Sequence, residues 1–232
     1  MNPRVLYRAA SYATDARSAA DSVISALSPA AWYRNATDIT ESGGFVSQWG
    51  DYSGNGRHLV QGTGTNQPAY SAGVLTFDGL DNFMSAAFVL PSPVTAVMVV
   101  KQVSWTANDR ILDGYNVDTS IIRQVTASPQ IEAWGGSSYT SNSSDLAVGA
   151  RGIVLRVWDG ASSVLRVNNG TEITDGSGTI STTGGITLGA RGGGGSEFSN
   201  IAVEELVVFN SALSLANRNS VITALNNALT VF

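Results

Sequence analysis

The chain is 232 residues long and 43% hydrophobic, which is enough for one large domain with a buried core. Its 13 basic and 18 acidic residues give a net charge of -5, so it lacks the positive field that holds a nucleic-acid backbone. The sequence has no cysteine, which excludes disulfides, zinc–thiolate sites and cysteine nucleophiles. No apolar run reaches the roughly 18 residues of a membrane helix. We therefore expect neither nucleic-acid binding nor membrane insertion.

The first predicted element is an amphipathic helix. Apolar residues recur at three- and four-residue spacing between residues 5 and 27, and Pro29 ends the pattern. The stripe is rich in alanine and narrow, so it suits packing on another helix, on another subunit or on its own domain. The stretch has no continuous apolar segment of a secretory signal. We divide the chain into a helical docking or oligomerisation segment, residues 1–28, and a second domain, residues 29–232.

From Ala31 onward short apolar runs alternate with turn residues, as in a β-sandwich or barrel. The run 94–103 is apolar on both alternating faces, which predicts a central strand covered on both sides. Asp159-Gly160 and Asn169-Gly170 predict tight hairpins within a meander. The predicted strands are 74–77, 83–88, 94–103, 110–112, 120–125, 130–134, 152–158, 163–168, 185–190 and 201–209.

The last predicted element is a single helix over residues 215–229. Ser214 precedes it, and serine caps helix N-termini through its side-chain oxygen. The glycine-rich tract 189–198 is interpreted as a loop, because a strand pattern resumes directly after it. The whole pattern predicts an all-β fold, a two-sheet antiparallel sandwich with one helix at each end of the chain.

The stretch "WGDYSGNGRHL", residues 49–59, gathers glycines, a carboxylate, a serine and the only histidine. A phosphate loop would need a lysine and a following helix, and neither is present. A catalytic triad of Ser53, His58 and Asp51 would come from separate segments rather than one. The remaining interpretation is a turn, in which Asp51 and Ser53 accept hydrogen bonds from the backbone ahead of them.

Carboxylates offer few candidate sites. Asp51, Asp78 and Asp81 are the candidate calcium ligands, with surface turns as the alternative, and no other cofactor is expected. Glu204 and Glu205 are adjacent on a predicted strand, so their side chains point to opposite faces and cannot face each other across a sugar. We therefore predict that the chain is not an enzyme and nominate no catalytic residue.

Aromatic residues suggest a sugar site, because their faces stack on ligands while nearby polar groups fix hydroxyls. Trp32, Trp49 and Trp158 sit among apolar residues and are predicted to lie in the core. The alternative for every aromatic at a strand end is that it caps the core. The candidate glycan-binding residues, which lie in or beside polar stretches, are Trp105, Asp109, Tyr115, Trp134 and Tyr139.

Several motifs, each of low specificity alone, become informative through their order along the chain. These are "AAWYRN", "VSQWGDYSGNGRHLVQ", "QPAY", "GVLTFDGLDNFM", "LPSPVTAVMVVK" and "AVEELVVFNSALSLANRNSVITAL". Over about residues 30–230 this order resembles the LamG-like, concanavalin A-like jelly-roll domains, of the type seen in tailed-bacteriophage virion proteins. The resemblance implies a jelly-roll sandwich, often with sugar or protein ligands on a concave face or at loop rims. It does not fix an activity, since one architecture serves many functions.

The resemblance leads to a first hypothesis of a virion surface protein, either a capsid decoration, a head fibre or a tail-associated adhesin. It would be assembled in the host cytoplasm, with the jelly roll facing outward. Residues 1–28 would contact other virion proteins or form a homo-oligomer, with a trimer expected first. A host-surface glycan is the candidate ligand of that outward face. The second hypothesis is a carbohydrate-binding, lectin-like module of a bacterial surface protein. The third, a polysaccharide-degrading enzyme, lacks the paired acids.

Overall fold

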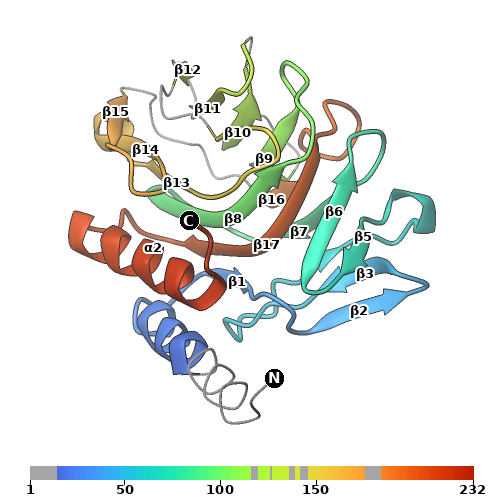
Figure 1. Cartoon of the computed structure of the whole chain (residues 1–232), viewed down its shortest axis with the longest axis horizontal. Coiled ribbons are helices and arrows are strands. Elements are labelled where there is room, and N and C mark those ends of the chain that lie inside the picture. The colour runs from blue at the N-terminus through green and yellow to red at the C-terminus, as the bar shows by residue number, and fades with distance from the viewer. Residues whose placement is uncertain (1–14, 116–119, 126, 136–138, 142–145, 176–183) are drawn as a thin grey trace, which may run out of the picture.

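The structure is a computed structural model of the whole chain, and it describes all residues except 1–14, 116–119, 126, 136–138, 142–145 and 176–183. In these described residues 17 strands join in one hydrogen-bonded ladder that folds into two facing layers (Figure 1). The strands of each layer pair antiparallel. The predicted all-β antiparallel sandwich is confirmed.

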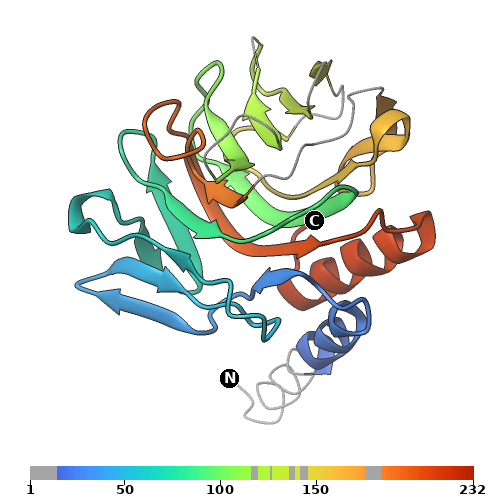
Figure 2. The ribbon, with the colours of Figure 1, turned by 180° about the vertical axis from the view of Figure 1, so that it is seen from behind.

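The two layers differ in their neighbours, because two helices lie against only one of them (Figures 1 and 2). The layer beside the helices has the order β15 (Ile173–Asp175), β14 (Ser163–Val167), β13 (Arg151–Trp158), β8 (Val94–Gln102), β17 (Asn200–Phe209) and β6 (Val74–Asp78), with β1 (Ala31–Tyr33) beside the second half of β17. The facing layer has the order β12 (Tyr139–Ser141), β11 (Ile131–Trp134), β10 (Ile121–Gln124), β9 (Arg110–Gly114), β16 (Gly185–Leu188), β7 (Met84–Ala87) and β4 (Leu59–Val60). The layers are joined through β5 (Ala69–Ser71) and β3 (Phe45–Trp49), and β2 (Ile39–Ser42) pairs with β3.

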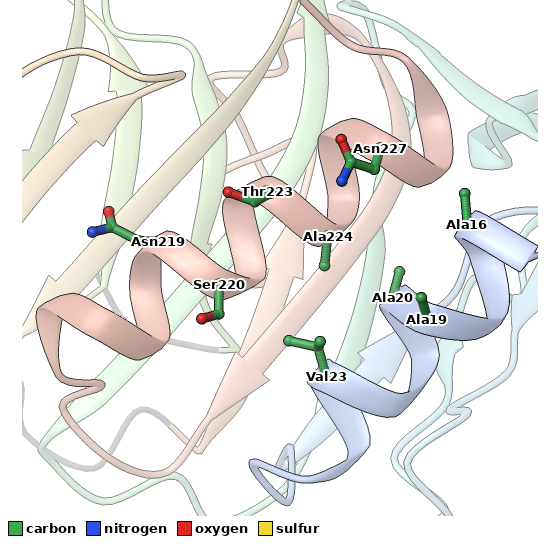
Figure 3. A pocket seen from close by; sticks show the side chains of 9 residues that line it. All are labelled: Ala16, Ala19, Ala20, Val23, Asn219, Ser220, Thr223, Ala224 and Asn227. Carbon is green, nitrogen blue, oxygen red and sulfur yellow. The ribbon is translucent and has the colours of Figure 1, made fainter.

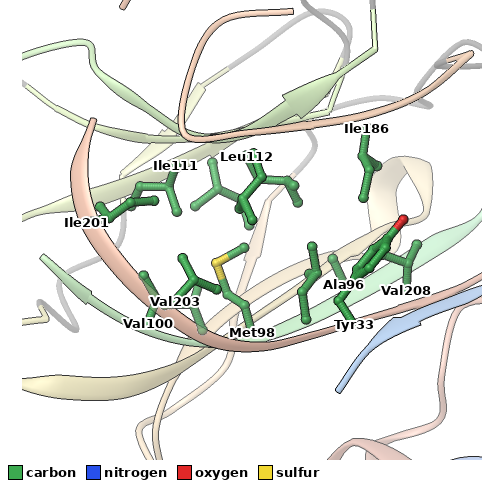
Figure 4. Packing of buried hydrophobic residues seen from close by; sticks show 14 of the residues in the cluster. Tyr33, Ala96, Met98, Val100, Ile111, Leu112, Ile186, Ile201, Val203 and Val208 are labelled. Atoms are coloured by element: carbon green, nitrogen blue, oxygen red, sulfur yellow. The ribbon is translucent and has the colours of Figure 1, made fainter. Parts of the chain in front are cut away.

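Strand β8 lies at the centre of its layer, as its sequence predicts. It pairs with β13 on one side and β17 on the other. Successive side chains of a strand point to opposite faces, so Met98 and Val100 enter the core between the layers while Val97 and Val99 enter a second core beneath the helices. Figure 4 shows the first core, where Met98 and Val100 lie opposite Ile111 of the facing layer.

The two helices complete the second core. The N-terminal helix covers residues 15–25 within the described chain, and α2 covers Leu215–Leu229. Ile24 and Leu225, one from each helix, are fully buried there. The Ser214 side chain accepts a hydrogen bond from the backbone N–H of Asn217, which confirms the predicted cap. Neither helix, as far as the structure describes them, is long and apolar enough to span a membrane.

The ten predicted strands all occur, and two local predictions need correction. Strand β14 is linked to its neighbours by longer connections than tight two-residue hairpins, because Val157 pairs with Val164 and Leu165 with Ile173. A 3-10 turn, η2 (Gly160–Ser162), occupies the first connection, and a second such turn, η1 (Gly64–Asn66), lies between β4 and β5. The strands missing from the prediction are short: β1 to β5, β12 and β15. Of the predicted helix 5–27, residues 5–14 lie outside the described chain.

Candidate functional site

The predicted glycan residues lie at two opposite ends of the layer formed by β9 to β12. Trp105 and Asp109 precede the start of β9, and Tyr115 follows its end. Trp134 pairs in register with Ile121, at the far end of β10. Strand β9 is five residues long, so the two groups are roughly 15 Å apart. The structure therefore does not bring the five residues together in one site.

At the first end, Asp109 belongs to a network of polar groups. Its backbone carbonyl accepts a hydrogen bond from the Gln124 N–H at 2.9 Å. Nearby, the Arg110 Nε donates to Glu197 Oε2 at 2.7 Å. Burial raises the pKa of the Asp109 carboxyl to about 6, a hydrogen bond from Thr106 opposes the rise, and the Glu197 charge adds to it. This end therefore holds a carboxyl that titrates close to neutral pH.

At the second end, aromatic residues flank the edge of the layer. Trp134 is partly exposed, and its backbone carbonyl accepts a hydrogen bond from Trp158 Nε1 at 3.0 Å. Tyr115 is also partly exposed, and its carbonyl accepts a hydrogen bond from the Thr187 hydroxyl at 3.2 Å. Tyr139 pairs in register with Trp134, but its side chain lies outside the described part. The predicted core positions of Trp32, Trp49 and Trp158 are confirmed, since each is 1% exposed or less.

Two of the three candidate calcium ligands, Asp51 and Asp78, accept backbone hydrogen bonds in turns, and Asp81 accepts one from the Asn82 side chain. Asp78 Oδ1 accepts hydrogen bonds from the N–H groups of Leu80 and Asp81 after β6. Asp51 lies in a different loop, after β3. Among the residues that the structure describes, no three histidine, aspartate or glutamate side chains gather as a metal site would require. Calcium binding remains a prediction, which calorimetric titration with calcium chloride would test.

The loop over residues 50–58 is organised around Asp51. One carboxylate oxygen accepts from the N–H groups of Trp32 and Ser53, at 2.9 and 3.0 Å, and the other from the N–H of Arg57 at 3.0 Å. The Asp51 N–H in turn donates to His58 Nδ1 at 3.0 Å. Asp51 is 7% exposed, so its carboxylate serves the loop. The predicted turn is confirmed, and His58 supports its backbone.

This loop also lines a polar pocket of about 430 Å³, which the sequence prediction missed. The end of the N-terminal helix, the start of β1 and the end of β17 complete the lining. Its hydroxyl groups come from Ser25, Ser28, Tyr52 and Ser53, and its amide and guanidinium groups come from Asn55, Asn210 and Arg57.

Tyr52 gives this pocket an aromatic ring that is 46% exposed. The ring meets that of Trp32 edge-to-face at 4.9 Å, and the Arg34 guanidinium lies 4.9 Å from the Tyr52 ring centre. Both neighbours are held by other contacts: Trp32 Nε1 donates to Glu205 at 2.7 Å, and Arg34 binds Asp21 at 2.8 Å. The Tyr52 ring is therefore fixed in place before any ligand arrives.

A second hollow, of about 440 Å³, lies between the N-terminal helix and α2 (Figure 3). Small residues line it from both helices. Ala16, Ala19, Ala20 and Val23 lie on one side, and Asn219, Ser220, Thr223, Ala224 and Asn227 lie on the other. None of the described residues that line it is charged or aromatic, so it suits a sugar less well than the polar pocket.

The N-terminal helix is tied to its own sandwich by a buried ion pair. Arg17 donates to both carboxylate oxygens of Glu205, at 2.6 and 2.9 Å. Arg17 also bonds Asp21, one turn along the helix. Part of the predicted docking segment thus packs on its own domain, and contact with other proteins through residues 1–28 remains a prediction.

Comparisons with known proteins give likeness in structure and none in sequence. No protein-family model and no curated protein sequence matches the chain. The Trypanosoma rangeli sialidase in complex with sialic acid matches with a TM-score of 0.65 and 10% identity, over 95% of this chain and 39% of the sialidase. An arabinofuranosidase complexed with arabinofuranosyl-alpha-1,2-xylobiose has a TM-score of 0.62 and 14% identity, over 79% of this chain and 51% of that chain. A GH54 α-L-arabinofuranosidase gives similar values, 0.63 and 15%.

At such low identity these matches show the fold alone, and this chain spans only part of each matched protein. They support the β-rich sandwich, while the family resemblance to phage LamG-like domains remains a prediction. The chain is therefore similar in fold to parts of carbohydrate-acting proteins.

The comparisons also overturn the prediction that the chain is not an enzyme. Sialidases and arabinofuranosidases are enzymes, and the fold of this chain occurs in their solved structures. The prediction rested on the lack of paired acids on one strand, but carboxyls can also meet from separate segments. Asp109 and Glu197 come from separate segments, and the charge of Glu197 adds to the effect of burial in raising the pKa of Asp109. The absence of a same-strand acid pair is therefore no ground for excluding catalysis.

Proposed function

We propose that the chain is a glycan-binding β-sandwich domain and that the polar pocket beside the 50–58 loop is its sugar site. The observation that carries the proposal is the presence, in one pocket, of the half-exposed Tyr52 ring and several side-chain hydroxyls and amides. Ser25, Ser28, Tyr52 and Asn210 make no side-chain hydrogen bond within the described chain. Sites for polar small molecules combine such an apolar face with a few placed polar groups.

The pocket is also preorganised. Asp51 fixes the loop through three backbone N–H groups, and Asn55 Nδ2 donates to the backbone carbonyls of Pro29 and Ala30 at 3.2 and 3.0 Å. A site whose groups are already ordered loses less conformational entropy when a ligand binds. Because the Tyr52 ring is already fixed, a sugar that stacks on it loses little binding free energy to ordering the ring.

Tyr52→Ala tests the proposal. A glycan array read with the purified chain should identify a ligand, and the substitution should weaken its binding at least tenfold, because the ring supplies the stacking surface. Phe45→Ala is the matched control, since Phe45 is similarly exposed, at 49%, but lies on β3 outside the pocket. Equal binding by Tyr52→Ala and the wild type would contradict the assignment of this pocket.

The two ends of the β9 to β12 layer are the alternative location. Trp105→Ala and Trp134→Ala test them, one at each end. If either variant abolishes glycan binding while Tyr52→Ala keeps it, the sugar site lies at that end and not in the pocket. In that variant, adding the glycan would no longer change the tryptophan fluorescence, which would report the same outcome.

We further propose that this domain faces outward from the surface of a tailed-phage virion. The ordered motifs from "AAWYRN" to "VVFNSALS" support this placement, and so does the N-terminal helix, whose residues Ser18, Ala19 and Ser22 stay exposed after it packs on the sandwich. Gold-labelled antibodies against the chain should decorate intact particles in electron micrographs. Particles of a host lysate that carry no label would contradict the placement.

A further inference from the structure

Arg57 brings a positive charge to the polar pocket that no lining carboxylate balances. The neighbouring arginines are neutralised: Arg17 binds Glu205 and Arg34 binds Asp21. Within the described residues Arg57 makes no ion pair, and none of the pocket's lining residues is an aspartate or a glutamate. The chain as a whole carries a net charge of -5, so an arginine without a carboxylate partner stands out.

The nearest carboxylate on this loop, Asp51, is already engaged. It accepts hydrogen bonds from three backbone N–H groups, including that of Arg57 itself, and it does not line the pocket. Backbone N–H groups bind a carboxylate strongly, since the acceptor is charged. Asp51 therefore shapes the loop without pairing with the Arg57 side chain.

The Arg57 guanidinium is held so that one edge stays available. Its Nη1 donates to the Ala30 carbonyl at 2.9 Å, and its central carbon lies 4.7 Å from the centre of the Phe88 ring. Nε and Nη2 have no hydrogen-bond partner among the described residues. These two nitrogens form the edge that binds a carboxylate, sulfate or phosphate with two parallel hydrogen bonds.

We infer that the polar pocket takes an acidic sugar, whose anionic group pairs with the free edge of Arg57 while its ring lies against Tyr52. The inference rests on the proposed glycan function and names its ligand class. The serine hydroxyls and the Asn210 amide would meet the sugar's hydroxyls, and the arginine would select for the charge. Arg57 is thus a specificity-determining residue.

The test compares charged sugars with neutral partners by calorimetric titration of the full chain. The pairs are oligogalacturonate and its methyl ester, a sulfated carrageenan oligosaccharide and a neutral agarose oligosaccharide, and glucose 6-phosphate and glucose. At least one charged member should bind ten times more tightly than its partner, and its affinity should fall as sodium chloride rises. The pair that shows the preference identifies the anionic group.

Three variants read out the role of Arg57. Arg57→Gln should abolish the preference for the charged member and leave binding of the neutral one, whereas Arg57→Lys should keep part of the preference because it keeps the charge. Arg151→Gln is the matched control, an arginine at the far end of the sandwich that binds Glu204. Thermal unfolding of each variant verifies that it is folded.

The outcomes separate this inference from the function on which it rests. Charged and neutral sugars that bind alike, or a preference that survives Arg57→Gln, overturn the inference alone, provided that Tyr52→Ala still weakens binding. If no sugar on the array or in the titrations binds, the proposed function fails and the inference with it.

Discussion

Glu205 is a fully buried carboxylate whose position depends on a β-bulge in β17. The pairing of β17 with β8 shifts between Val203 and Glu205, so the prediction that Glu204 points to the opposite face is wrong. Glu204 binds Arg151, which also donates to backbone carbonyls at the end of α2 and so lies on the helix side. Glu205 instead accepts hydrogen bonds from Trp32 Nε1 and from the Arg17 guanidinium. A buried charge is tolerated only when such partners satisfy it. The bulge, which the sequence prediction missed, therefore places both glutamates on the side of the helices, Glu205 in a buried network and Glu204 nearer the surface.

Removing the Glu205 carboxylate should destabilise the fold strongly. Glu205→Ala leaves the Trp32 Nε1 donor and the Arg17 guanidinium without their acceptor, and breaking a buried pair costs about 3–5 kcal/mol. Glu204→Ala is the adjacent control and should cost no more than about 1 kcal/mol, because its pair is partly exposed. Urea unfolding measures both. Equal losses from the two variants would contradict this difference in roles.

Asp109 should make stability depend on pH in a direction unusual for a carboxyl. Burial raises its folded pKa to about 6, above its ordinary value of 3.8. Between these values the folded state binds more protons than the unfolded state, so this group lowers stability as pH rises from 3.8 to 6. Asp109→Asn should stabilise the chain at pH 8, by no more than about 1 kcal/mol because the group is partly exposed, and should have no such effect at pH 3. The same stability difference at both values would contradict the shift.

At the scale of elements, the sequence predicts strands that carry an apolar pattern of their own, down to the four residues of β7 and β10, and misses β2, which is equally short and carries none. The run from Val94 is apolar on both faces, and only a central strand uses such a pattern, so β8 was predictable. Strand β2 is mostly exposed and has four residues, so its sequence carries no hydrophobic period. Ser214 predicted the start of α2, because its side chain makes a local hydrogen bond with the first turn of the helix. Elements defined by local rules could be predicted, and those held only by a neighbouring strand could not.

Two substitutions in the 50–58 loop should have different effects, because one removes the carboxylate at its centre and the other adds a side chain to a glycine. Asp51→Ala removes the acceptor of three backbone N–H groups, one buried and two partly buried, so we expect both lower stability, by about 1–3 kcal/mol, and at least tenfold weaker glycan binding. Gly54→Ala puts a side chain on a residue with φ of 84° and open space around it, which should cost about 1–2 kcal/mol without altering the pocket. Thermal unfolding and glycan titration of both variants compare the two effects. Unchanged binding in Asp51→Ala would show that the loop does not shape the site.

At the scale of the whole molecule, the polar pocket exists because three segments that are distant in the sequence converge. Ser28 follows the N-terminal helix, Trp32 lies on β1, Tyr52 belongs to the loop after β3, and Asn210 follows β17. None of these residues is unusual in its own stretch of sequence. The turn around Asp51 follows from local hydrogen bonds and could be predicted, whereas the pocket beside it depends on strand β1 pairing with β17. That long-range pairing leaves no local signal, which is why sequence reasoning chose the aromatic residues near β9 and β11 instead.

The same convergence predicts that the N-terminal helix and the sandwich unfold together. Ile24 is buried in the core beneath the helices and Arg17 is bonded to Glu205, so loss of the helix exposes apolar surface and a buried charge. Far-ultraviolet circular dichroism and tryptophan fluorescence should therefore report one coincident transition in urea. Ile24→Ala should shift both signals equally, by about 2–5 kcal/mol, while Ser22→Ala on the exposed side of the helix should change stability by less than about 0.5 kcal/mol. A dichroism signal that falls before the fluorescence would contradict a shared core, and would leave the helix free to dock on another protein.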